Sequence, residues 1–208
     1  MAIQLPQAGS GKPPVCEAIK IHMRIAELML PTIDKEYAEY PRELVRQRSD
    51  LVSSLIRKIS GKLGMEGNFK NGCLYREKGL DERFRRGTGT QVCDHAVPVV
   101  DLTKMYLDDR RLNLVQLALY PVVRLTDKSN SRLTADGLAN AGCKNGFPLY
   151  RYSQVEGPEI EIVTHEGVLL STSEWTDEDH WDLVRQTAKS NPDLLEIIEH
   201  FKIFQSVG

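Results

Sequence analysis

Apolar residues recur at helical spacing in two segments near the N-terminus. Over 15–30 they populate one broad face, and Pro31 is expected to end this helix because proline removes a backbone donor. From about Pro41 to Leu63 they recur at intervals of three, four and seven, and a proline suits the first turn of a helix. The two segments together predict an antiparallel pair of helices.

The middle of the chain alternates between strand-like and helix-like patterns, after a stretch (67–90) without a strong period. Residues 90–102 (TQVCDHAVPVVDL) are rich in β-branched side chains and predict a short strand, yet the ionisable pair Asp94 and His95 lies inside it. The pattern then predicts a polar helical stretch over 102–119, a strand over 120–125 and a helix capped by Thr126 or Asp127.

The last third of the chain predicts short strands followed by helices. The strands are expected at 147–152, 160–163 and near 168–170. The sequence from Thr176 to Asp179 resembles a capping box that opens an acidic helix, and Pro192 begins a final amphipathic helix. Trp175 and Trp181 are expected to be core residues. This order of elements, without an internal repeat, predicts an α+β fold.

Composition narrows the class of protein. With 208 residues, 41% hydrophobic and 27% charged, the chain is long enough to bury a core and ordinary for a globular protein. It has no apolar run of 18 residues, which predicts no membrane span, and residues 1–14 are expected to be a flexible tail rather than a signal peptide. Its four cysteines are far apart, which predicts a cytoplasmic location without disulfides and makes a zinc site from Cys73, Cys93 and Cys143 unexpected.

Charge is unevenly distributed along the chain, although the net charge is only −2. Residues 42–86 contain twelve Lys or Arg against six Asp or Glu, which gives +6. Residues 154–208 contain three against twelve, which gives −9. This difference suggests a basic face for a polyanion and an acidic region with another task, or simply two solvated surfaces.

The elements that follow Asp94 and His95 in the chain suggest what this ionisable pair does. The strand with Asp94 and His95 is followed by an inserted helical stretch, a second strand and a capped helix that carries Asn130. DHAVPVV resembles the D/E-H-x-x-P segment of the HNH-like (ββα-metal) endonucleases, and LTDKSNSRL resembles the helix of that family. The resemblance covers 92–136. It implies a ββα-metal nuclease core over 67–152, a helical region at 15–66 for DNA binding or dimerisation, and an acidic strand-plus-helix extension at 153–208.

The resemblance also implies a chemistry, namely Mg²⁺- or Mn²⁺-dependent hydrolysis of phosphodiester bonds in DNA, as in phage or restriction enzymes. Asp94 and Asn130 would hold the metal through hard oxygen ligands, and the neutral imidazole of His95 would take a proton from water. Asn113, in RRLNLVQL, matches the family's middle asparagine, which orients the histidine, and Asp127 is a rival ligand to Asn130. Neighbouring strand residues point to opposite faces, so the strand must end or bend at His95 for both groups to act on one phosphate.

Phosphate contacts would come from basic side chains and would make DNA binding strongly salt-dependent. A cut on both DNA strands would favour a homodimer with two-fold symmetry. The candidates are Arg83, Arg85, Arg86, Arg124 and Arg132.

Three other interpretations stay open. The chain could be a non-catalytic, nuclease-like scaffold that acts as a nucleic-acid-binding or inhibitor protein, with its acidic region on a basic partner. It could be a hydrolase with Cys93 as nucleophile, although Asp94 on the opposite strand face is the sole evident acid to orient His95. Asp94 and His95 could also form a buried structural pair. His180 lies in an acidic stretch and is not expected to bind a metal.

Overall fold

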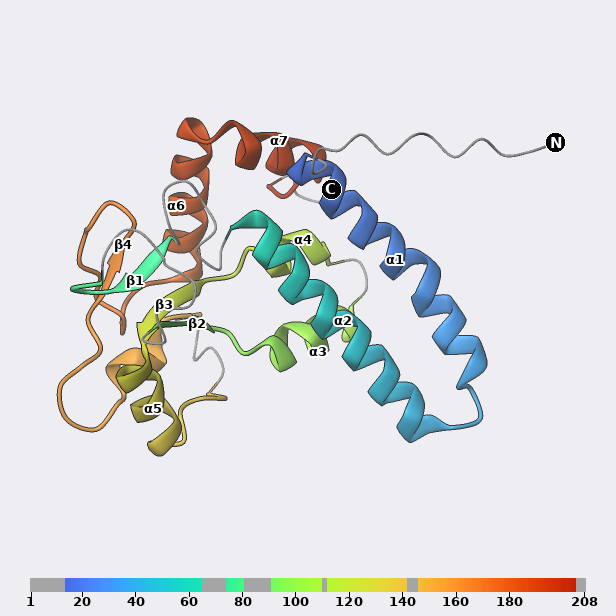
Figure 1. Cartoon of the computed structure of the whole chain (residues 1–208), viewed down its shortest axis with the longest axis horizontal. Helices are drawn as coiled ribbons and strands as arrows, with labels where there is room; N and C mark the ends of the chain where they lie inside the picture. Colours follow the sequence, from blue (N-terminus) through green and yellow to red (C-terminus); the bar gives the residue numbers. More distant parts are fainter. Residues whose placement is uncertain (1–13, 65–73, 81–90, 110–111, 142–145, 205–208) are drawn as a thin grey trace.

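The computed structural model describes residues 14–64, 74–80, 91–109, 112–141 and 146–204. Helices flank a small sheet (Figure 1), which confirms the predicted α+β class. The helices are α1 (Val15–Glu36), α2 (Pro41–Leu63), α3 (Val99–Asp108), α4 (Leu114–Ala118), α5 (Asp127–Ala135), α6 (Asp177–Ser190) and α7 (Pro192–His200), with a 3₁₀ helix at Tyr150–Ser153. The strands are β1 (Tyr75–Glu77), β2 (Gln91–His95), β3 (Val122–Thr126) and β4 (Ile162–Thr164).

Helices α1 and α2 lie side by side as the predicted antiparallel pair (Figure 1). The prediction that Pro31 ends α1 was wrong, because the helix continues to Glu36. Proline removes one backbone hydrogen bond, but Leu30 and Ile33 on either side of it are buried, and this packing offsets the loss.

Helix α2 has the boundaries that its end signals predict. Pro41 occupies the first turn, where its missing N–H costs nothing, and Gly64 ends the helix in the left-handed conformation with φ of 76°. The buried face of α2 packs against α3 and α4, which follow β2 in the chain. The helical pair is therefore joined to the rest of the fold mainly through α2, and α1 also contacts α7.

The sheet has the strand order β2-β3-β1-β4. β2 pairs with β3 antiparallel, β1 pairs with β3 parallel, and β1 pairs with β4 antiparallel. β1 was not predicted, because three residues are too few to show a period. The strand predicted at 147–152 was wrong, since this segment contains the 3₁₀ helix, and the strand predicted near 168–170 is reduced to an isolated bridge between Val163 and Leu169.

Two further predictions need correction in the middle of the chain. β2 ends at His95 and α3 begins at Val99, so 90–102 is not one strand. Pro98 is the N-cap of α3, and its fixed φ and missing N–H suit a helix start better than a central strand. The helical stretch predicted over 102–119 is divided into α3 and α4.

A buried polar cluster connects α6 to the sheet. His180 of α6 is fully buried; its Nδ1 lies 2.8 Å from the Tyr75 hydroxyl, and its Nε2 lies 3.0 Å from the carbonyl oxygen of Leu119. A carbonyl accepts only, so Nε2 carries the proton and Nδ1 accepts from Tyr75. The indole of Trp175 donates to the same hydroxyl at 3.3 Å. The histidine therefore serves packing and hydrogen bonding within the core.

The end signals of the last two helices are confirmed. Thr176 and Asp179 form the predicted capping box at the start of α6, and Pro192 begins α7. No helix within the described ranges is both long enough and apolar enough to cross a membrane.

Replacement of Tyr75 by Phe should lower the free energy of unfolding by about 1–3 kcal/mol, because Nδ1 of His180 loses its donor in a site without water access. Urea unfolding followed by circular dichroism measures this loss. Tyr40→Phe is the matched control, since Tyr40 is 63% exposed. Equal stability of the two variants would contradict the role of the cluster.

Stability should also fall in acid because of His180. Burial lowers the pKa of His180 from 6.5 to about 3, so between these values the unfolded chain binds a proton that the folded chain does not. The free energy of unfolding should therefore decrease as pH falls from 6.5 toward 3. Urea unfolding at a series of pH values measures the slope, and His180→Leu should flatten it. An unchanged slope in that variant would refute this cause.

Candidate functional site

Asp94 and His95 are the last two residues of β2. Directly after them, the backbone N–H of Ala96 donates to the carbonyl of Pro121 at 2.9 Å, and Pro98 then starts α3. The ionisable pair thus lies where the strand ends. This position is required if both side chains are to act on one phosphate.

A pocket of about 190 Å³ opens beside this strand end. β2 is an outer strand of the described sheet, so side chains from both of its faces can reach a pocket along its free edge. Cys93, Asp94 and His95 of β2 line it. The rest of the wall comes from three other segments, through Arg57 of α2, Pro98, Val99 and Val100 at the start of α3, and Ala139 and Asn140 after α5.

The surroundings of His95 favour the neutral form of its imidazole. Its side chain is 9% exposed, and its Nε2 atom is buried without a hydrogen-bond partner among the described residues. Burial, together with the nearby positive charges of Arg57 and Arg151, lowers the pKa of His95 from 6.5 to about 4. At neutral pH the ring is therefore uncharged, with one nitrogen able to accept a proton.

Positive charge also borders the pocket. Arg57 of α2 is one of its lining residues. The first N–H groups of a helix have no partner within the helix and carry the positive end of its dipole, and Val99 and Val100 at this position of α3 line the pocket. The pocket can therefore receive an anionic group beside His95.

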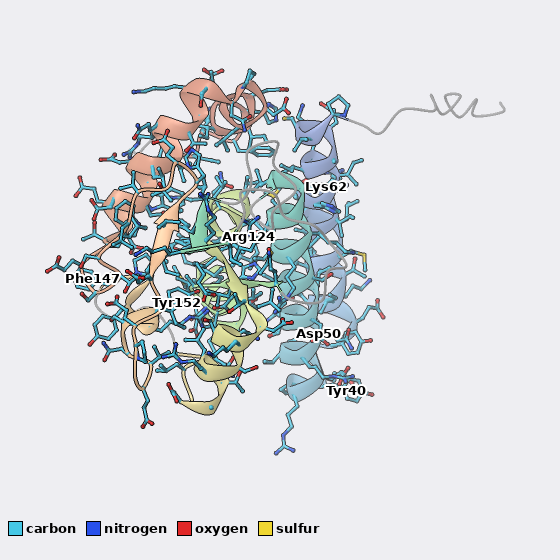
Figure 2. All side chains as sticks on the ribbon, turned by 60° about the vertical axis from the view of Figure 1, so that its left-hand side comes forward. Tyr40, Asp50, Lys62, Arg124, Phe147 and Tyr152 are labelled. Carbon is cyan, nitrogen blue, oxygen red and sulfur yellow. The ribbon has the colours of Figure 1, made fainter. Side chains whose placement is uncertain are left out.

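Asp94 is held by two neighbouring residues of the 3₁₀ helix. Arg151 forms an ion pair with Oδ2 of Asp94, and the hydroxyl of Tyr152 donates to the same oxygen at 2.8 Å. Burial raises the pKa of Tyr152, so this hydroxyl stays protonated and remains a donor. Figure 2 labels Tyr152 in the interior of the molecule. The Asp94 side chain keeps 17% exposure.

The guanidinium of Arg151 also connects the walls of the pocket. Its side chain is 2% exposed, and it donates to the backbone carbonyl of His95 at 2.7 Å and to that of Ala139 at 2.9 Å. A single buried cation therefore contacts the end of β2 and the segment after α5.

Asn130 and Asp127 lie on α5, which packs against β2 and β3. Thr126 rather than Asp127 is the N-cap, since its hydroxyl accepts from the N–H of Ser129. Asp127 is exposed, and Asn130 is half-buried beside the inward-facing Ser129. Neither of the two candidate ligands is among the described lining residues of the pocket, in which the amide is that of Asn140.

Asn113 caps a helix. Its side-chain oxygen accepts from the backbone N–H of Val115 at 2.9 Å, and its amide nitrogen donates to the carbonyl of Phe201 at 2.7 Å. The predicted helical state of Asn113 was wrong, since it is the N-cap of α4. The structure gives its side chain these contacts, and it is not among the described residues that line the pocket.

The arginines predicted to contact phosphate have different environments. Arg124 is 1% exposed within β3, in register between Arg76 and Cys93, so its contact with a phosphate would require neighbouring residues to move (Figure 2). Arg132 donates to the carbonyls of Glu156 and Pro158. Arg83, Arg85 and Arg86 lie outside the described residues.

Cysteine chemistry has limited support from the described residues. Cys93 is half-buried and lines the pocket with His95 on its own strand face, whereas Cys73 and Cys143 lie outside the described ranges. Within those ranges, no group of three or more His, Cys, Asp or Glu side chains could hold a metal ion.

Four residues of this site were not predicted from the sequence. Arg57 was one of many basic residues on α2, and Asn140 fell within the helix that was expected to continue to the glycines at 142 and 146, whereas α5 ends at Ala135. Arg151 and Tyr152 were assigned to a strand. The adjacent Arg and Tyr in an apolar stretch (PLYRY) were a usable signal, since a buried arginine requires an acidic partner.

Comparisons with protein-family models, with curated proteins and with solved structures find no match. The likeness to HNH-like endonucleases therefore depends on the residues of this chain alone.

Proposed function

We propose that this chain is a metal-dependent endonuclease of the HNH type that hydrolyses phosphodiester bonds in DNA. The observation that carries the proposal is that Asp94, His95 and Arg57 line one pocket at the end of β2. The succession of two antiparallel strands, β2 and β3, and helix α5 supports it. A carboxylate, a neutral base and a cation around one cavity are groups that phosphodiester hydrolysis uses.

In this proposal His95 is the general base. Its unpartnered Nε2 accepts a proton from the attacking water, which requires the neutral ring. A phosphate bound beside Arg57 offsets the charge that lowers the pKa of His95, and so brings this pKa closer to neutrality, where a base is most effective. The same phosphate gains charge stabilisation from Arg57 and from the start of α3.

The donors near the pocket fit a hard divalent cation such as Mg²⁺ or Mn²⁺. Asp94 offers a carboxylate, and Asn130 on α5 and Asn140 on the pocket wall offer amide oxygens, all of them hard ligands. When bound, such an ion supplies positive charge to the phosphate and to the leaving oxygen. Asp94 and Asn130 are the proposed ligands, with Asp127 and Asn140 as rivals.

DNA is the proposed substrate, and α2 provides a basic surface for it. Arg57, Lys58 and Lys62 are exposed along the C-terminal half of this helix, and Figure 2 shows Lys62 near its end. Farther toward the N-terminus, Arg46 and Arg48 of α2 form ion pairs with acidic residues. Contacts of the C-terminal half with phosphates would make binding depend strongly on salt.

One observation favours the second candidate function, a non-catalytic scaffold that binds nucleic acid or inhibits a partner. The carboxylate of Asp94 already has a cationic partner in Arg151. In a protein without catalysis, this ion pair would be a structural link and nothing more. The two candidates differ in whether the chain cleaves DNA.

The wild-type chain should nick supercoiled plasmid in the presence of Mg²⁺ or Mn²⁺, and His95→Ala should slow nicking by about 10²–10⁴-fold because the general base is lost. Gel electrophoresis of the plasmid measures both rates. His200→Ala, at an exposed histidine on α7, is the matched control. Circular dichroism verifies that each variant is folded. Equal nicking by wild type and His95→Ala, or nicking by neither, would exclude the enzyme.

The second metal ligand can be identified from metal titrations of nicking. Asn130→Ala should raise the Mg²⁺ concentration for half-maximal nicking by about tenfold or more, since an oxygen that binds the metal is lost. Asp127→Asn should have little effect, because this exposed side chain starts α5. A larger effect of Asn140→Ala than of Asn130→Ala would place the ligand after α5 instead.

A further inference from the structure

The 3₁₀ helix Tyr150–Ser153 contains a deeply buried charge next to the candidate site, and neither the motif nor the proposed mechanism uses it. Arg151 is 2% exposed at its side chain and forms an ion pair with Asp94. Tyr152, the next residue, is fully buried and donates to the same carboxylate oxygen, Oδ2. Two donors thus meet on one atom of the residue proposed to hold the metal.

This arrangement is poorly explained by stability alone. Removing an arginine and a carboxylate from water costs several kcal/mol for each ion, and apolar residues of similar size often replace such pairs without loss of stability. The pair also lies beside a pocket, and the Asp94 side chain keeps 17% exposure while Arg151 has 2%. The cation is therefore enclosed, and the carboxylate stays within reach of solvent.

The contacts of Arg151 fix the backbone as well as the carboxylate. Its guanidinium donates to the carbonyl of His95 at 2.7 Å and to that of Ala139 at 2.9 Å. The backbone of the proposed base and the segment that carries Asn140 are thus connected to one rigid planar group.

The contacts also distinguish the two oxygens of Asp94. In the hydrogen bonds that the structure gives for the described residues, both donors of the 3₁₀ helix reach Oδ2. A carboxylate has about four acceptor positions on two oxygens, so Oδ1 keeps its capacity for another partner. Such an orientation favours binding of a cation through one oxygen.

We propose that Arg151 and Tyr152 are positioning residues that hold Asp94 by Oδ2 and direct Oδ1 toward the divalent cation. This inference depends on the proposed function, because it assigns a role to residues behind its metal ligand. Arg151 and Tyr152 touch neither substrate nor metal, and they act through Asp94. Outer residues that orient metal ligands typically contribute 10- to 100-fold to metal affinity.

Mn²⁺ binding tests the proposal without reference to cleavage. Isothermal titration calorimetry with the full chain and Mn²⁺ alone should give a Kd that is about tenfold weaker in Tyr152→Phe, which removes one donor and keeps the ring. Arg151→Lys keeps the charge but loses the fork that joins Asp94 to two carbonyls, and it should also bind more weakly. Tyr40→Phe, at a tyrosine that is 63% exposed, is the matched control and should bind like wild type.

A merely structural role is excluded by two further measurements. Thermal unfolding should show each variant folded at the titration temperature. In the Asp94→Asn background, Tyr152→Phe should have no additional effect on Mn²⁺ binding, because the residue through which it acts has lost its charge. An additional tenfold loss in that background would overturn the positioning role.

The outcomes separate the two proposals. Unchanged Mn²⁺ affinity in Tyr152→Phe, in a chain that binds Mn²⁺ and nicks DNA, overturns the positioning role and leaves the endonuclease intact. Tighter binding in Arg151→Gln than in wild type also overturns it, since Arg151 would then compete with the metal for Asp94. Failure of the wild-type chain both to bind Mn²⁺ and to nick DNA overturns the proposed function itself.

Discussion

The need of a buried guanidinium for hydrogen-bond acceptors shapes the centre of this molecule. Arg151 has almost no contact with solvent, so the two terminal nitrogens of its guanidinium find their acceptors inside the protein, whereas its Nε is buried without a partner among the described residues. The acceptors come from the end of β2, at Asp94 and His95, and from Ala139 after α5. Displacing any of these segments would leave a buried charge without compensation. The geometry of the pocket is therefore coupled to the satisfaction of one side chain.

The helical pair at the N-terminus belongs to the same arrangement. Sequence patterns separate it from the region that follows, because the helices and the ionisable motif have different periods. In the structure α2 packs against α3 and α4, and Arg57 of α2 lines the pocket with Asp94 and His95. The helix that buries the apolar face of the pair thus also brings positive charge to the candidate site. Packing and electrostatics depend here on the same element.

Local signals predicted much of the helical part of the fold. A proline at the first turn and a left-handed glycine after the last turn set both ends of α2, and a capping box set the start of α6. These signals work because they act within one turn of the chain. Pro31 led to a wrong end for α1, because the helix is kept intact by tertiary contacts of the buried residues near Pro31, and these contacts are not local signals.

Strands were harder to predict, because β-branched residues fit several environments. Val97, Val99 and Val100 resemble a strand by composition, yet two of them begin α3 after Pro98. The pattern put Asp94 and His95 inside a strand over 90–102, whereas they are the last residues of β2, and Asn130 lies on the helix after the second strand as expected. Arg57 and Asn140 were beyond reach, because nothing local links them to the motif. For Arg151 and Tyr152, the stretch PLYRY indicates a buried arginine but does not identify its acidic partner.

The separation between the motif and the residues that hold it has a consequence for folding. Arg151 pairs with a residue 57 positions earlier in the chain, so the ion pair closes a long loop that includes β3, α5 and the segment after it. During synthesis, Asp94, His95 and Asn130 all emerge before Arg151 does. A chain that ended after α5 would contain Asp94, His95 and Asn130 but would lack Arg151 and Tyr152, which hold Asp94. The contacts that fix Asp94 can therefore form only after the chain has been synthesised past α5.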